Sequence, residues 1–135
     1  MNEILELLSN APSFFGYFVV GLIFFGAYLL AYTAVTKCNE LLLIRHGNMA
    51  AAYSLVGSSL GFSLPLSMAI SRSASAQGFV FWAFVAMVTQ ICTYYFLKLV
   101  LKDMDGQIEA NNAAYGLLAG GISLVVGVIN AACVA

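Results

Sequence analysis

The chain has 135 residues, a formal net charge of −1, and a composition that is 62% hydrophobic but only 8% charged. Soluble domains carry about 25% charged residues because a surface in water must be solvated. The composition therefore excludes a water-soluble globule and indicates a protein surrounded by lipid. It also excludes the basic surface that nucleic-acid binding requires, and three scattered cysteines with one histidine exclude the usual zinc sites. We expect no metal, no cofactor and no nucleic-acid partner.

Four apolar runs follow one another along the chain, and each is long enough to cross a bilayer, which takes about 20 helical residues. In hydrocarbon every backbone amide must be paired within its own segment, so each run is predicted to be a helix. The predicted helices cover residues 14–36, 49–71, 78–101 and 112–134. The sequence therefore predicts an all-α membrane protein, with a single transmembrane domain over residues 1–135 built as two tandem helical hairpins.

The N-terminal segment and the connections are short. Met1–Asn10 spaces its apolar side chains helically and is expected to lie along the outer interface of the bilayer. Four of the five basic residues flank the two loops within the hairpins, and the fifth, Arg72, lies on the other side. The four are Lys37, Arg45, Lys98 and Lys102. The positive-inside rule therefore places these loops in the cytoplasm and both termini outside, in the periplasm.

The two hairpins resemble each other when the chain is shifted by 64 residues, which defines repeat one as 14–71 and repeat two as 78–135. Six identities fall within positions 44–60, centred on the second helix of each hairpin: Ile44, Asn48, Ala50, Gly57, Ser59 and Leu60 match Ile108, Asn112, Ala114, Gly121, Ser123 and Leu124. Because each unit has an even number of spans, both repeats point the same way. A pseudo-twofold axis along the membrane normal is expected.

Aromatic and small residues are divided between the predicted helices. The first and third helices hold 15 of the 18 aromatic residues, whereas the second and fourth are rich in glycine and serine. Small residues let helix backbones approach closely, and this contact drives helix association in lipid. The candidate packing residues are Gly57, Gly61, Gly116, Gly120, Ser123 and Gly127. We therefore expect the second and fourth helices to pack together, the first and third to face lipid, and the chain to form a homo-oligomer.

A few polar residues in or near the spans have two readings each. Asn48 and Asn112 are expected to cap the second and fourth helices, or else to form a polar mouth where positive helix ends attract an anion. Pro65 is expected to kink the second helix, or to free a carbonyl that lines a polar path. Gln90 and Asn130 are read as interhelical hydrogen-bonding groups, or as members of such a path, with Asn130 close to the Pro65 region.

Glu40 and Arg45 lie in the first cytoplasmic loop, on either side of the apolar stretch Leu41–Ile44. This stretch is expected at the membrane interface, with Arg45 among the lipid headgroups as an anchor. Docking of a cytoplasmic protein partner is the alternative role for the two residues.

These same stretches resemble the YjfL-like bacterial inner-membrane proteins, the family of the domain of unknown function 350. The resemblance lies in Glu40-Leu, Ile44-Arg45-His-Gly47-Asn48-Met-Ala50-Ala51-Ala52 and Leu60-Gly61-Phe-Ser-Leu64-Pro65-Leu66, and continues in Asn112 to Gly116 and Val126-Gly127-Val-Ile-Asn130-Ala131-Ala132-Cys133. One departure is Asn111, where a glycine is expected before the second-repeat asparagine. The resemblance implies a bacterial inner-membrane location and a tandem-repeat fold, and implies no activity or catalytic residue.

Two functions are consistent with these features. The leading hypothesis is an oligomeric transport or permeation component, because polar and small residues gather on the second and fourth helices. The alternative is a membrane scaffold that recruits a partner through its cytoplasmic loops, for instance in envelope stress. An enzyme is not expected, since no nucleophile–base pair, carboxylate dyad or metal cluster occurs at catalytic spacing.

Overall fold

The computed structural model describes residues 1–36, 39–72 and 75–134, and every regular element in these ranges is a helix. The helices are α1 (Asn2–Val35), α2 (Glu40–Arg45), α3 (Met49–Arg72), α4 (Ala76–Val100), α5 (Met104–Glu109) and α6 (Ala113–Cys133). By length and composition α1, α3, α4 and α6 could each cross a membrane. The predicted all-α architecture with four spanning helices is therefore confirmed. Lys37, Cys38, residues 73–74 and Ala135, which were assigned to connections or helix ends, lie outside the described residues.

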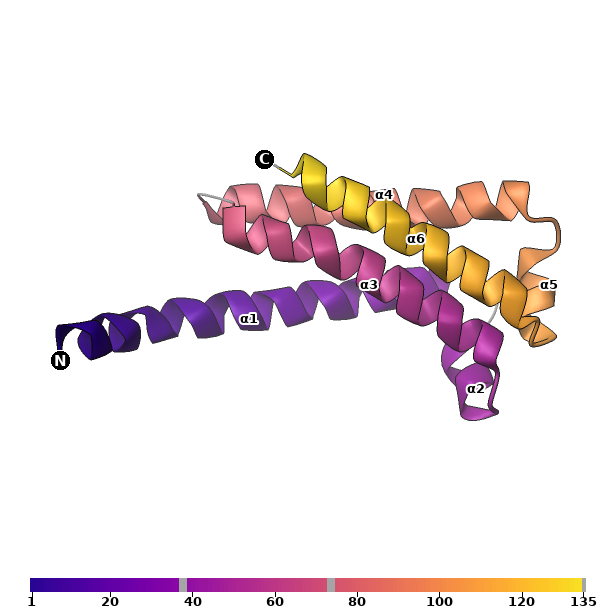
Figure 1. Ribbon diagram of the computed structural model, residues 1–135, viewed down its shortest axis with the longest axis horizontal. Helices are drawn as coiled ribbons and strands as arrows, with labels where there is room; N and C mark the ends of the chain where they lie inside the picture. Colours follow the sequence, from indigo (N-terminus) through magenta and orange to yellow (C-terminus); the bar gives the residue numbers. More distant parts are fainter. Residues whose placement is uncertain (37–38, 73–74, 135) are drawn as a thin grey trace.

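The first helix begins twelve residues earlier than expected, at Asn2 instead of residue 14. Met1–Asn10 is therefore not a separate interfacial segment but the first turns of α1, which continues through Pro12. Proline removes only one helical hydrogen bond, and the residues around it are exposed, so no packed neighbour forces a break. Figure 1 shows this part of α1 extending well beyond the ends of the other helices.

The tightest contact in the molecule joins α3 and α6, which run in the same direction with their backbones touching. A Cβ atom on Gly57 would overlap the backbone of Gly120, and one on Gly116 would overlap the backbone of Ala50. A Cβ on Gly127 would likewise overlap the Gly61 carbonyl. Only glycine permits such an approach, and close backbone contact supplies the packing energy that lipid cannot.

The two remaining long helices, α1 and α4, were both expected to face lipid, and for α4 this expectation is wrong. α1 lies mainly on the surface and packs on α3 through Gly21, Tyr28 and Tyr32. α4 was expected to face lipid, but it packs against both α3 and α6 and buries seven residues. Its buried side is lined by Ala83, Ala86 and Gln90. The count of aromatic residues in the whole helix had hidden this narrow face of small residues.

The two loops fold into matching elbows at one end of the bundle, opposite both termini (Figure 1). The short helix α2 covers residues 40–45, and α5 covers residues 104–109, which are the same positions 64 residues later. In the first elbow Asn48 N donates to Leu43 O (2.9 Å) and Gly47 N to Ile44 O (3.0 Å). In the second elbow Asn112 N donates to Gln107 O (2.9 Å) and Asn111 N to Ile108 O (3.0 Å). These are the two bonds of a Schellman motif.

This motif explains the departure at Asn111. Gly47 has a φ of 83° and Asn111 a φ of 61°, so both occupy the left-handed region that glycine, and next asparagine, tolerates best. The asparagine side chain also does what glycine cannot. Asn111 Oδ1 accepts from Met49 N (2.8 Å) and Ala50 N (3.2 Å), and so caps α3 from the other elbow.

Candidate functional site

Among the described residues, the most deeply buried charged side chain lies where the first elbow meets the bundle. Glu40, at the start of α2, is only 3% exposed, and its Oε2 has no hydrogen-bond partner among the described residues. Burial is the main reason why the pKa of its carboxyl lies above the ordinary value; a hydrogen bond with Thr36 opposes this rise, and the nearby charge of Asp105 adds to it. A side chain this deep is not presented at the surface, so its burial does not favour partner docking, the alternative role given to Glu40.

Two buried tyrosine–serine contacts lie further into the bundle than Glu40. Tyr32 lies within electrostatic range of Glu40, and its Oη lies 3.0 Å from Ser54 Oγ. One helical turn deeper, Tyr28 Oη donates to Ser58 O (3.4 Å). The spacing of four residues on α1 and on α3 brings each tyrosine opposite a serine. We call Glu40, Tyr32, Ser54, Tyr28 and Ser58 the polar track.

A second carboxylate joins the elbow end of the polar track from the other hairpin. Asp105 of α5 accepts a hydrogen bond from Tyr94 Oη (2.8 Å) and forms an ion pair with Lys98 (3.3 Å). The Tyr94 ring packs edge-on against Tyr32, with ring centroids 5.9 Å apart. Side chains from α1, α2, α3, α4 and α5 therefore converge on one polar centre.

The inner end of the polar track is closed by an aromatic stack. The Phe62 ring lies parallel to Tyr28 at 4.4 Å, and both side chains are fully buried. Beside Phe62, the backbone of Gly61 approaches the Gln90 side chain, whose Nε2 donates to Ser123 O (3.2 Å). Gln90 Oε1 is buried without a hydrogen-bond partner among the described residues. Gln90 thus joins α4 to α6 and keeps one free acceptor.

The remaining polar residues divide between the elbows and the far end of the bundle. Asn48 Oδ1 accepts from Ala51 N (2.9 Å), an N-cap of α3, while its Nδ2 donates to Ile108 O (2.8 Å). Asn112 occupies the N-cap position of α6, as predicted, but its side chain makes no capping hydrogen bond; its Nδ2 donates instead to Gln107 Oε1 (3.0 Å). Asn130 Nδ2 is buried and finds no partner among the described residues, so no bond joins it to the Pro65 region.

Two other candidates have clear positions. Pro65 is buried in α3, and the Gly61 carbonyl that it frees lies against Gly127. That carbonyl therefore belongs to the helix contact and lines no path. Arg45 is exposed at the end of α2. Among the described residues, no group of three or more His, Cys, Asp or Glu side chains could hold a metal ion.

Comparison with known proteins adds the family. The model for the Domain of Unknown Function DUF350 matches residues 6–134. The chain belongs to the DUF350 family. The inner membrane protein YjfL (UPF0719) of Escherichia coli K12 is 30% identical over 129 residues, which cover 96% of this chain and 98% of the relative, and YjfL of E. coli O157:H7 matches equally. No solved structure matches.

The family match confirms the resemblance seen in the sequence motifs, and this DUF350 protein is a multi-pass inner-membrane protein. Sequence reasoning missed the tyrosines and serines of the polar track. A signal was present: Tyr28 and Tyr32, like Ser54 and Ser58, are four residues apart and so share a helix face. The tyrosines were counted as aromatic residues of a lipid-facing helix, and their hydroxyl groups were not considered.

Proposed function

We propose that this inner-membrane protein is a transport or permeation component, and that it conducts protons along the polar track. The observation that carries the proposal is the buried Glu40 carboxyl, with two buried tyrosine–serine contacts further into the bundle. Polar groups inside a membrane bundle are costly, so they mark ion or proton pathways more often than they serve packing.

Protons suit this interior better than a larger solute. The α3–α6 contact leaves no room for a pore between these helices, because the backbones touch at Gly57 and Gly120. The grooves beside α1 are lined mainly by apolar side chains. The hydroxyl groups of Tyr32, Ser54, Tyr28 and Ser58, in contrast, both donate and accept, so by rotating they can pass a proton without a wide channel. In the structure Tyr28 Oη donates to the Ser58 carbonyl, so in this proposal Tyr28 must turn from that carbonyl to a hydroxyl for the proton to pass.

The two ends of the polar track have different roles in this proposal. Glu40 receives the proton at the elbow end, where burial favours its neutral form. Its free Oε2 and the hydrogen bond with Thr36 offer a route to Tyr32 and Ser54. The Phe62–Tyr28 stack closes the inner end, beyond which the free acceptor of Gln90 is the next polar group.

The test is proton flux into liposomes that hold the purified protein and a pH-sensitive dye, with a potassium gradient and valinomycin as the driving force. We expect Glu40→Gln to lower the flux towards that of protein-free vesicles, since an amide cannot take up and release a proton. Phe62→Ala should raise the flux, since the stack no longer covers Tyr28. Glu109→Gln is the matched control, because Glu109 lies in the second elbow with an exposed side chain, and should leave the flux unchanged.

Wild-type vesicles that leak no faster than empty ones, together with Phe62→Ala vesicles that also do not leak, would rule the proton path out. Equal losses in Glu40→Gln and Glu109→Gln would show that Glu40 acts only through general stability.

The finer architecture is part of the same proposal. The matching elbows support two tandem hairpin repeats. Association into a homo-oligomer and a role other than that of an enzyme belong to the proposal as well. The elbow end carries Arg45, Lys98 and Lys102, which favours a cytoplasmic elbow end with both termini in the periplasm. Cysteine labelling from either side of intact cells would test this, since His46→Cys in the first elbow should react only with a membrane-permeant reagent.

The scaffold alternative is favoured by the exposed rim of the elbows, which carries Arg45 and His46 on one side and Glu109 on the other. A cytoplasmic partner could bind there without reaching Glu40. Arg45→Glu should then abolish co-purification of that partner from native membranes while proton flux stays at its wild-type value.

A further inference from the structure

Each of the two helices in the central contact has two opposite faces: one of small residues, which makes the contact, and one that mixes small residues with valine or leucine. Face A of α3 consists of Ala50, Ser54, Gly57 and Gly61, and the positions 64 residues later on α6 are Ala114, Leu118, Gly121 and Val125. Face B of α6 consists of Gly116, Gly120, Ser123 and Gly127, and the corresponding positions on α3 are Ala52, Val56, Ser59 and Ser63. Faces A and B are two residues apart in register, which is about 200° around a helix.

The contact within the chain joins unlike faces. Face A of α3 meets face B of α6, since Gly57 lies against Gly120, Gly61 against Ser123 and Gly127, and Ala50 against Gly116. If face A of α3 had packed against face A of α6, the contact would have been self-complementary and would have left no A face free. Because face A of α3 packs against face B of α6, face B of α3 and face A of α6 both stay free. One free face of each kind is the arrangement of a heterologous interface.

Both remaining faces are open in the structure. On face A of α6, Gly121 is exposed and a Cβ atom there would have no neighbour within 4 Å, although its counterpart Gly57 is in backbone contact. Val125 is 57% exposed. On face B of α3, Val56 is 56% exposed. A glycine in an exposed helix position is less favourable than alanine, and no described residue uses the space that Gly121 provides.

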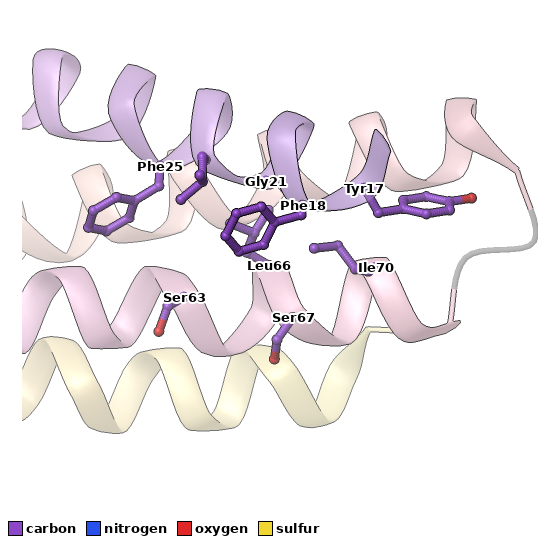
Figure 2. Close-up of a pocket in the computed structure, with 9 residues that line it drawn as sticks. Tyr17, Phe18, Gly21, Phe25, Ser63, Leu66, Ser67 and Ile70 are labelled. Carbon is purple, nitrogen blue, oxygen red and sulfur yellow. The ribbon is translucent and has the colours of Figure 1, made fainter. Parts of the chain in front are cut away.

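The free B face lies beside a groove that a helix could enter. Figure 2 shows this groove between α1 and α3, with Ser63 and Ser67 on one side and Phe18 and Phe25 on the other. Its volume is about 360 Å³. Both serine hydroxyls already donate to their own helix, at 2.8 Å and 2.7 Å, so the groove offers an apolar surface. A helix that entered this groove would contact α3 and α1. Within the chain, α3 has the equivalent place in the other repeat, where it contacts α6 and α4.

We propose that a second copy of this chain inserts the free A face of its α6 against the free B face of α3, in the groove beside α1. The contact follows the register of the α3–α6 packing, with both copies in the same membrane orientation. The two helices lie further apart than in the internal contact, because Ala52, Val56 and Ser63 stand where that contact has Gly116, Gly120 and Gly127. Each copy then has one donor face and one acceptor face, so copies add head to tail, and they form a ring where the rotation between copies closes. This assembly does not depend on the proton path, which runs inside one chain.

The internal contact predicts which residues meet across the interface. Shifting each internal pair by 64 residues places Gly121 of one copy against Val56 of the next, and Ala114 against Ala52. Within one chain the members of each pair lie on opposite sides of the α3–α6 contact. A cross-link between them therefore reports a contact between two copies.

The experiment is disulfide cross-linking in native membranes, starting from a chain in which Cys38, Cys92 and Cys133 are replaced by serine. We expect Val56→Cys with Gly121→Cys in one chain to give a ladder of dimers and larger products on oxidation. The Ala52→Cys and Ala114→Cys pair should behave alike. Two single variants expressed together should give dimers only. The controls are the same four positions in the wrong register, Val56→Cys with Ala114→Cys and Ala52→Cys with Gly121→Cys, which should give no ladder.

Three results would overturn the proposal: no product from either matched pair, equal products from the mismatched pairs, or efficient dimers from Gly121→Cys alone, which would mean that two α6 helices pack symmetrically. A bulky residue gives an independent check. Gly121→Leu should abolish the ladder of the Ala52 and Ala114 pair, whereas Gly16→Leu, at another glycine with open space around it, should preserve it. Loss of the ladder in both variants would also contradict the proposal.

Discussion

Glu40 is a carboxyl group that the fold holds away from water. Burial raises the pKa of Glu40 above its ordinary value, so the folded state binds a proton more tightly than the unfolded chain does. The contribution of neutral Glu40 to the free energy of unfolding is fully present below the pKa of an unfolded glutamate, about 4.3. This contribution is lost as the pH rises through the higher pKa that Glu40 has in the folded state.

Stability should therefore depend on pH through this one residue. We expect the thermal midpoint of the wild-type protein in detergent to fall between pH 5 and pH 8 by more than that of Glu40→Gln, whose amide does not ionise. The measurement is thermal unfolding of both proteins at several pH values, and the difference between the two curves isolates Glu40. Parallel curves would mean that ionised Glu40 is well solvated in the fold.

Asn111 has a left-handed backbone conformation, and its side chain caps α3, the helix that follows the first elbow. Asn111→Gly keeps the backbone conformation but loses the cap, at a cost of about 1 kcal/mol. Asn111→Ala also loses the side-chain amide that makes the left-handed conformation tolerable for asparagine, while it keeps the unfavourable Cβ there, and should cost about 2 kcal/mol. Chemical unfolding of the two variants in detergent would check the order, and an alanine variant as stable as the glycine variant would refute the backbone argument.

At the level of the helices, the glycines of α3 and α6 were found from the sequence because the GxxxG pattern reports close packing directly. The burial of α4 was missed, since a helix with many aromatic residues can still present a narrow face of small ones. The early start of α1 was also missed, because Pro12 resembles a helix boundary. A proline on an exposed helix surface removes one bond and need not end the helix.

The α3–α6 contact should be the least tolerant of added volume. A Cβ on Gly120 would overlap the Tyr53 carbonyl, so Gly120→Leu must push the two backbones apart and should cost about 3 kcal/mol. Gly16→Leu in α1 is the matched control, because a side chain there meets nothing within 4 Å. The fraction of folded protein extracted from membranes, and its thermal midpoint, should fall for Gly120→Leu alone.

At the level of the whole molecule, composition and the four apolar runs were enough to predict the spanning helices, since lipid leaves a chain few alternatives. The polar track could not be assembled from the sequence. It needs side chains of α1, α2 and α3 to meet, and this meeting depends on how the first elbow folds Glu40 back against Tyr32. Apolar helices give little register information of their own, so the relative depth of two helices is a property of the packed bundle.

The crossed caps between the elbows also constrain how the protein is made. The α3 amides of Met49 and Ala50 are capped by Asn111, 62 and 61 residues further along the chain. At about 5–20 residues per second, a ribosome needs several seconds to add the missing partner. Until then the only cap of α3 that the first hairpin can supply is the bond from Ala51 N to Asn48 Oδ1, and the Met49 and Ala50 amides gain their partner only when the last loop is synthesised.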